Sequence, residues 1–261
     1  MVNKSTEASI ITSYFNSGRY VKESMDRIFK FCDFYSKKKF EIIVINDGSD
    51  DNTLIELKKL AKVKKTFYSN CVIKIIDLKK NFGQAGAYIV GMLQATGKRI
   101  LILEGDFVKE KEINLINSYK KYLILEKKGN DLLIFEKIFL SRSIMDNVCS
   151  FVFWKIYFFT SGIKLQRNIC WTRIFDKKIL NKAIKYDLLE FNANKIFLKE
   201  SKSFKVFNIK KKFKGYSSYT FLKKLKLATI LIFYNFIRLR KINVNFQKKK
   251  YMKRIQSLVK I

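Results

Sequence analysis

The stretch FEIIVINDGSDDNTLIELKKLAKV, residues 40–63, decides the fold class. It opens with a nearly continuous apolar run, residues 40–46, which is typical of a strand buried on both faces. A turn of Asp, Asn, Gly and Ser residues follows, and the rest has the capping residues and late lysines of a helix. A strand that leads directly into a helix is the repeating unit of parallel α/β sheets.

The same alternation continues on both sides of this stretch. Residues 8–15, 71–77 and 99–104 are predicted strands, and residues 20–35 and 83–97 are predicted helices. We therefore expect an α/β fold in which helices cover both faces of a mostly parallel central sheet. Further along the chain the pattern is looser, with a predicted helix at 112–126, a predicted strand at 131–139 and an aromatic-rich amphipathic stretch at 143–165.

Polar and aromatic side chains stand where these strands end. Parallel strands end at one rim of a sheet, and ligands of such sheets bind there. The residues at the predicted strand ends are Phe15, Asn46, Asp47, Asp77, Glu104 and Asp106. Glu104 and Asp106 are separated only by a glycine, so both carboxylates fall on one side of an extended chain.

The composition excludes several kinds of site. The chain has 261 residues and no histidine, which rules out Ser-His-Asp catalysis and histidine-ligated zinc. A metal would need oxygen ligands, which favours Mg²⁺ or Mn²⁺. The four cysteines form no CxxC pair and no zinc pattern, so reduced thiols are expected. No secretory signal precedes the first apolar run, which predicts a cytoplasmic location.

The charge is large and unevenly distributed. The formal net charge is +32, and residues 201–261 contain 18 Lys and Arg residues and no acid. Such a segment needs an anionic neighbour, either nucleic acid or an anionic membrane surface. The apolar part of residues 224–241 is shorter than the roughly 20 residues of a membrane span. Its basic flanks favour a helix lying in the membrane interface over a helix packed on the domain.

Four segments carry a family resemblance: SIITSYFNSGRYVKESMDRI (9–28), FEIIVINDGSDDNT (40–53), LKKNFGQAGAYIVGMLQATGKRILILEGDF (78–107) and NICWTRIFDKKI (168–179). In this order they resemble the family 2 glycosyltransferases of GT-A fold, and within them the polyprenyl-phosphate sugar synthases and O-antigen glycosyltransferases. The resemblance covers residues 8–240. It implies a GT-A domain at 1–210, with a nucleotide-binding half (1–108) and an acceptor half (109–210). A basic amphipathic C-terminal segment, expected at the membrane, occupies 211–261.

The resemblance implies a donor site for a nucleotide sugar. Its residues would be Phe15, Asn16, Asn46, Asp47, Asn81, Glu104 and Asp106. Phe15 takes the place of an aromatic residue near the nucleotide base, and Asn46 replaces an acid, which makes Asp47 the better candidate for contact with the nucleoside. Glu104-Gly105-Asp106 falls where the family carries Asp-x-Asp. The implied ligand of Mg²⁺ or Mn²⁺ is Asp106, with Glu104 supporting the sugar, the metal or its waters.

The resemblance also implies an acceptor that is a lipid phosphate or a lipid-linked saccharide. The residues expected near an acceptor phosphate are Arg142, Arg173, Lys214, Ser217 and Tyr219. A phosphate is already a nucleophile and needs positioning more than a base. A sugar hydroxyl would need a carboxylate base, for which Glu190 is preferred to Asp176 and Asp187. Asp106, Arg173 and Glu190 are thus the expected catalytic residues of an inverting transfer in bacterial surface polysaccharide synthesis.

Two rival functions remain open from the sequence. Departures from the family pattern at Ser13, Glu104, Val108 and Arg167 would suit a non-catalytic protein that binds a nucleotide sugar. The basic C-terminal segment alone would suit a nucleic-acid-binding protein, although no helix-turn-helix, RNP or zinc signature supports it, and no nucleic-acid partner is expected. The leading expectation is an enzyme that is peripheral on the inner face of the cell membrane.

Overall fold

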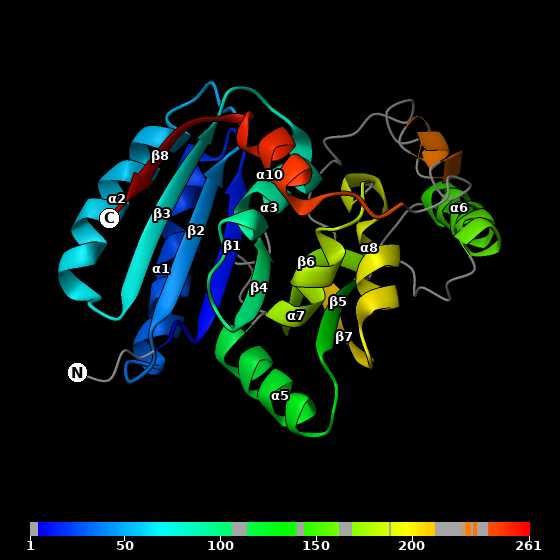
Figure 1. The fold of residues 1–261 in the computed structure, drawn as a ribbon, viewed down its shortest axis with the longest axis horizontal. Coiled ribbons are helices and arrows are strands. Elements are labelled where there is room, and N and C mark those ends of the chain that lie inside the picture. The colour runs from blue at the N-terminus through cyan, green and yellow to red at the C-terminus, as the bar shows by residue number, and fades with distance from the viewer. Residues whose placement is uncertain are drawn as a thin grey trace.

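The computed structural model describes residues 5–105, 114–139, 144–161, 169–187, 189–211, 226, 228–230, 232–233 and 240–261 (Figure 1). Its strands are β1 (Ala8–Tyr14), β2 (Phe40–Asn46), β3 (Cys71–Leu78), β4 (Arg99–Glu104), β5 (Leu132–Phe139), β6 (Ile169–Asp176), β7 (Phe204–Lys211) and β8 (Ile255–Lys260). Its helices are α1 (Gly18–Phe34), α2 (Thr53–Phe67), α3 (Gly83–Leu93), α5 (Leu115–Lys127), α6 (Ile144–Ser161), α7 (Lys177–Ala183), α8 (Leu189–Glu200) and α10 (Val244–Met252).

The strands form one sheet in the order β7-β5-β6-β4-β1-β2-β3-β8. Strands β1 to β4 are parallel, and β5 pairs in parallel with β7. Strand β6 runs antiparallel to both β4 and β5, and β8 runs antiparallel to β3. Six strands therefore point one way and two the other, which confirms the predicted mostly parallel α/β sheet.

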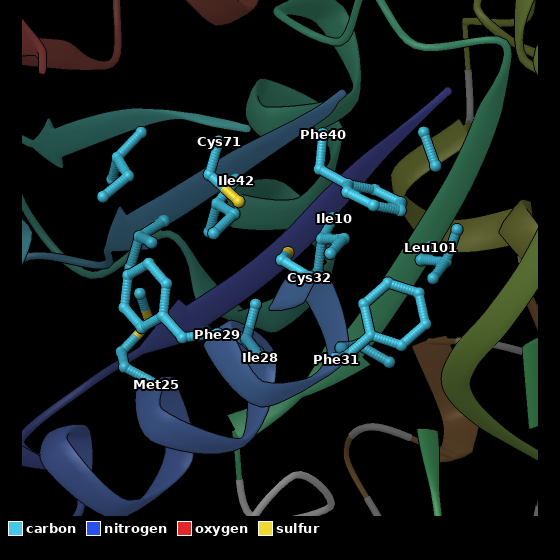
Figure 2. Close-up of a cluster of buried hydrophobic side chains, with 14 of the residues drawn as sticks. Ile10, Met25, Ile28, Phe29, Phe31, Cys32, Phe40, Ile42, Cys71 and Leu101 are labelled. Atoms are coloured by element: carbon cyan, nitrogen blue, oxygen red, sulfur yellow. The ribbon is translucent and has the colours of Figure 1, made fainter. Parts of the chain in front are cut away.

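Two hydrophobic cores cover the two faces of the sheet, because alternate residues of each buried strand point to opposite sides. One core joins the sheet to α1, α2 and α5, and the other joins it to α3, α7, α8 and α10. Figure 2 shows the first of these, where Met25, Ile28, Phe29, Phe31 and Cys32 of α1 pack over Ile10, Phe40 and Ile42. All four cysteine thiols are free, as predicted.

The strand register brings the predicted strand ends to one rim. Tyr14 of β1 pairs with Asn46 of β2, which pairs in turn with Asp77 of β3. Ser13 of β1 pairs with Glu104 of β4. Because β6 and β8 run the opposite way, they begin at the rim where these parallel strands end. The rim is thus lined by strand ends from both halves of the sheet.

The end of the chain differs from the expectation of one basic amphipathic segment over 211–261. Helix α10 packs on α3, and β8 extends the sheet beyond β3, at the left edge of Figure 1. Strand β8 is short, and its exposed positions, Gln256, Leu258 and Lys260, alternate with half-buried ones. This pattern is weak inside a lysine-rich tail, so the sequence did not reveal the strand. Among the described helices, none has both the length and the apolar character to cross a bilayer.

Candidate active site

The turns that follow β1 and β2 are bonded to each other at the rim. Asn16 has a positive φ of 47°, a conformation that asparagine tolerates better than most residues. Its backbone N–H donates to Ser49 Oγ at 3.0 Å, and its Oδ1 accepts from the Asp50 N–H at 2.9 Å. Phe15, beside it, is 43% exposed. The exposed ring therefore stands on a turn that is fixed from two sides.

Asn46 and Asp77 form a buried polar pair at the ends of β2 and β3. Asn46 Nδ2 donates to Asp77 Oδ1 at 2.7 Å, and both residues are buried. An ionised carboxylate only accepts hydrogen bonds, so the pair fixes which end of the Asn46 amide faces Asp77. Asn46 Oδ1 is buried and has no hydrogen-bond partner among the residues that the structure describes. Leaving such an acceptor unpaired costs about 1–3 kcal/mol. Native proteins seldom leave a buried polar atom unpaired unless it has a function or binds a water or an ion.

Asp47 ties the turn after β2 to the loop that precedes α3. Its Oδ1 accepts from the Phe82 N–H at 2.8 Å, and its own N–H donates to the Tyr14 carbonyl at 2.9 Å. In the same loop, Asn81 Oδ1 accepts from the Gly83 N–H at 2.8 Å. We call residues 79–83 the donor loop, after the expectation from the sequence that Asn81 binds a sugar donor; the loop is bonded to the Asp47 carboxylate through Phe82.

Gly48 is required by the close approach of this turn to the donor loop. Its φ is +64°, and a Cβ built there would lie 2.2 Å from the Lys80 carbonyl carbon and 2.5 Å from Asn81 N. Both atoms belong to the backbone, so no side-chain rotation relieves the overlap. Glycine is therefore needed here for its lack of a side chain as well as for its φ.

Gly48→Ala should lower the free energy of unfolding by more than the roughly 1–3 kcal/mol that a left-handed backbone alone costs a non-glycine residue. The excess comes from the overlap with the donor loop. Urea unfolding measures it, and Gly129→Ala is the matched control. Gly129 has a φ of +87° and no atom within 4 Å of its virtual Cβ. Equal losses of unfolding free energy in the two variants would show that a Cβ at residue 48 does not overlap with the donor loop.

Glu104 is held in place by β6. The residue is buried, its Oε1 accepts from the Trp171 N–H at 2.8 Å, and its own N–H donates to Thr172 Oγ1 at 3.2 Å. The Trp171 ring packs against Tyr88 of α3, with centroids 5.4 Å apart. The carboxylate is thus fixed at the end of β4 by a strand of the acceptor half.

Arg173 is a fully buried cation, and none of its hydrogen-bond partners within the described ranges is a carboxylate. It is 1% exposed, and its guanidinium lies about equally far from the rings of Trp171 and Phe197, at 5.0 and 5.1 Å. It donates to the carbonyls of Cys170 and Trp171 and to Asn194 Oδ1, while Nη1 has no partner among the described residues. Burial lowers its pKa to about 10, with Cys170, Glu104 and Tyr88 acting the other way. Within the described ranges, carbonyl and amide oxygens rather than carboxylates accept hydrogen bonds from this charge.

The remaining predicted site residues differ in whether the structure describes them. Glu190 lies in the first turn of α8, on the acceptor half. The other predicted site residues lie outside the described part of the chain: Asp106, Arg142, Lys214, Ser217 and Tyr219.

The buried Glu136, on β5, was missed by the sequence analysis, and burial raises its pKa. The strand that carries Glu136 was predicted, so only its position near the rim end of β5 could have drawn attention to it.

Relatives of known name match part of the sequence. A dodecaprenyl-phosphate galacturonate synthase of Rhizobium johnstonii is 26% identical over 187 residues, 69% of this chain and 51% of that protein. An undecaprenyl-phosphate 4-deoxy-4-formamido-L-arabinose transferase of Proteus mirabilis is 30% identical over 103 residues, 40% of this chain and 30% of that protein. The chain spans about half the length of the galacturonate synthase.

Solved structures share the fold. S. aureus TarS 1–349 with UDP-GlcNAc has a TM-score of 0.56 and 18% identity, covering 95% of this chain and 72% of that one. The mannosyltransferase PcManGT of Pyrobaculum calidifontis, solved with GDP-Man and Mn²⁺, has a TM-score of 0.54 and 14% identity, covering 80% and 57%. These likenesses confirm the predicted GT-A fold. The sequence profile of glycosyl transferase family 2 matches residues 9–183 of the 261, more than half of the chain, and the protein belongs to that family.

Proposed function

We propose that the protein transfers a sugar from a nucleotide-sugar donor to a polyprenyl phosphate or a lipid-linked saccharide, in the synthesis of an O-antigen-like bacterial surface polysaccharide. The observation that carries the proposal is the polar rim of a family 2 fold, where Asn46 and Asp47 stand at the end of β2, Asp77 at the end of β3 and Glu104 at the end of β4. The relatives named for polyprenyl-phosphate sugars support the class of acceptor.

The donor would lie along the nucleotide-binding half of the rim. The exposed Phe15 ring offers a face for a nucleobase to stack on, which is favourable for any base. Asn16 fixes the turn beneath it, and the unpaired Asn46 Oδ1 is an acceptor that a bound ligand would satisfy. Asp47 and Asn81 hold the donor loop in the conformation that faces the nucleotide.

The residues at the end of β4 fit a hard divalent cation in part. Carboxylate oxygens are the ligands that Mg²⁺ and Mn²⁺ prefer, and Glu104 is a carboxylate at the rim whose Oε1 accepts from the Trp171 N–H. Within the described ranges no group of three or more acidic or cysteine side chains could hold a metal. Asp106 would therefore be the direct ligand, with Glu104 in support. The bound cation would offset the charge of the departing diphosphate.

The acceptor would approach from the β5–β6 side. Arg173 supplies a cation whose Nη1 has no partner in the described part of the chain, which suits an anionic group, and the arginine fork matches phosphate oxygens. Arg142, Lys214, Ser217 and Tyr219 would complete a phosphate site. A phosphate acceptor needs no base. A hydroxyl acceptor would need one, and Glu190 or Glu136 would serve in a single inverting displacement.

A donor screen by thermal shift tests the proposal, because a ligand that binds only the native state raises the melting temperature. Uridine and guanosine diphosphates and their sugars, each with and without Mn²⁺, are the probes. We expect one nucleotide class to stabilise the protein in the presence of Mn²⁺ and its sugar donor to be slowly hydrolysed. Stabilisation without any hydrolysis would favour the non-catalytic, nucleotide-sugar-binding alternative.

We further propose that the protein is peripheral on the inner face of the cell membrane. Helix α6 lies at the far right of Figure 1, away from the central sheet. It exposes an apolar stripe at helical spacing: Val148, Phe151, Val152, Ile156 and Phe159. Lys155 lies over the Phe151 ring, so a cation accompanies the stripe. An apolar face beside basic groups suits an anionic bilayer surface, as does the basic C-terminal segment, where Phe233 is 63% exposed.

Phe159→Asp should weaken binding to anionic vesicles roughly tenfold even at low salt, because it places a charge where an apolar ring enters the interface. Phe159 is 89% exposed, so the fold tolerates the change. Phe67→Asp, on α2 at the opposite end of the molecule and 76% exposed, is the control. Co-sedimentation measures both. Ile232→Asp with Phe236→Asp should release the protein in the same way.

High salt should weaken binding of the parent protein without ending it, since salt screens charge but not burial. Parent-like sedimentation of Phe159→Asp would contradict the role of α6. Binding to duplex DNA but not to vesicles would instead support the nucleic-acid alternative.

A further inference from the structure

Residues 240–261, which we call the C-terminal strap, run from the acceptor half to the nucleotide-binding half. At the acceptor end, the Asp187 N–H donates to the Arg240 carbonyl at 3.2 Å and the Ile242 N–H donates to the Lys185 carbonyl at 2.6 Å. Gln247, fully buried, donates from Nε2 to the Tyr186 carbonyl at 2.7 Å. The strap is therefore fixed to the end of α7 before it reaches the nucleotide-binding half.

The strap then crosses α3 and joins the sheet beside β3. Tyr251 of α10 is fully buried in the core that α3 shares, and β8 pairs with β3 from Ile255 to Lys260. Because β8 is antiparallel to β3, the turn between α10 and β8 lies where β3 ends, at the rim. Figure 1 shows this path, with α10 over α3 and β8 at the sheet edge.

This turn contacts the donor loop through Arg254. The Lys79 N–H donates to the Arg254 carbonyl at 2.9 Å. The Arg254 guanidinium carbon lies 4.6 Å from the centroids of both the Phe82 and the Tyr251 rings. Phe82 is thus held on its ring by Arg254 and on its backbone N–H by Asp47. One residue of the strap therefore contacts the donor loop twice, through its carbonyl at Lys79 and through its guanidinium at Phe82.

We infer that the C-terminal strap positions the donor loop, with Arg254 as the positioning residue that holds Phe82 so that Asp47 and Asn81 face the nucleotide. The expected effect of Arg254 on donor binding rests on the proposed function. Its expected effect on the loop rests on its contacts alone. The backbone bond to Lys79 survives any substitution of Arg254. A variant at this position therefore removes the contacts of the side chain, including those with the Phe82 and Tyr251 rings, and leaves the backbone bond in place.

Three variants of the full chain test the inference: Arg254→Ala, Arg254→Lys and Lys253→Ala. Lys253 is the adjacent, exposed residue and is a control for loss of one positive charge. Amide hydrogen exchange of the donor loop is measured without ligand, because it reports local opening directly. Dissociation constants for UDP and GDP with Mn²⁺ follow, and then KM and kcat for the donor that the parent accepts.

For Arg254→Ala we expect faster exchange at Phe82 and Gly83 and a rise of roughly threefold to tenfold in the nucleotide dissociation constant and in KM, with kcat unchanged. Arg254→Lys should restore part of the loss, and Lys253→Ala should match the parent. Exchange in Arg254→Ala equal to that in Lys253→Ala would overturn the inference, as would faster exchange with unaltered nucleotide binding. If the parent binds neither nucleotide while the exchange responds, the positioning of the loop stands and the proposed function falls.

Discussion

Asp106→Asn should abolish the Mn²⁺-dependent part of donor binding and lower sugar transfer roughly a thousandfold, since a divalent cation at a departing diphosphate supplies several kcal/mol. Asparagine keeps the size of the side chain and loses the charge that holds the cation. Asp106 lies outside the described residues, directly after β4 and Gly105. Calorimetric titration of nucleotide with and without Mn²⁺ measures the binding, and a steady-state transfer assay measures the rate.

Asp176→Asn is the matched control for this substitution. Asp176 is the register partner of Arg99 where β6 pairs with β4, at the end of these strands opposite the rim. Its side chain caps α7 by accepting from the Lys178 N–H, and an asparagine side chain can cap a helix in the same way. The Asp176→Asn protein should therefore bind nucleotide and transfer sugar as the parent does. Full turnover by Asp106→Asn would exclude Asp106 as the metal ligand and would transfer the question to Glu104.

Arg173→Met should lower transfer to the lipid acceptor at least about a hundredfold, the loss typical of removing one buried group that stabilises a developing or bound anion. Its effect on stability should be small, within about 2 kcal/mol, because two contributions oppose each other. Three hydrogen bonds are lost, worth about 1 kcal/mol each. A buried cation whose pKa is lowered to about 10 is also removed, and an apolar side chain is favoured between Trp171 and Phe197.

Urea unfolding and transfer kinetics together decide the role of Arg173. Arg27→Met, which removes a partly exposed arginine paired with Glu23 on α1, serves as the control and should change neither quantity much. A loss of stability above about 4 kcal/mol with parent-like turnover of the folded fraction would assign Arg173 to the fold alone.

The sequence predicted the strands and helices of residues 8–104 well because their signals are local. Each of the first four strands is a mostly apolar run, and a helix with its own period follows the first three. Placing Asn46, Asp77 and Glu104 at one rim needed only the rule that parallel strands end together. The pairing of Asn46 with Asp77 needed the register, which no short stretch of sequence carries.

The acceptor half and the strap were less predictable because their determinants are distant in the chain. Strand β6 lies between β4 and β5 and reverses direction, so its partners precede it by tens of residues. Strand β8 returns from the end of the chain to pair with β3. Arg254 and Phe82 are far apart in the sequence, and nothing near either residue indicates that they meet. Because lysine is abundant throughout the chain, the sequence also does not indicate which basic residues have a fixed partner.

Transfer of a labelled sugar into lipid tests the central claim most directly. The purified chain is incubated with labelled UDP- and GDP-sugars, Mn²⁺ and anionic vesicles that contain undecaprenyl phosphate or lack it, and the lipid fraction is then extracted. We predict label in the lipid fraction from one donor class, dependent on both Mn²⁺ and the lipid phosphate, and lost in Asp106→Asn and Arg173→Met. Nucleotide binding without label in lipid, and without hydrolysis of any donor, would contradict the account and leave a nucleotide-sugar-binding protein without transferase activity.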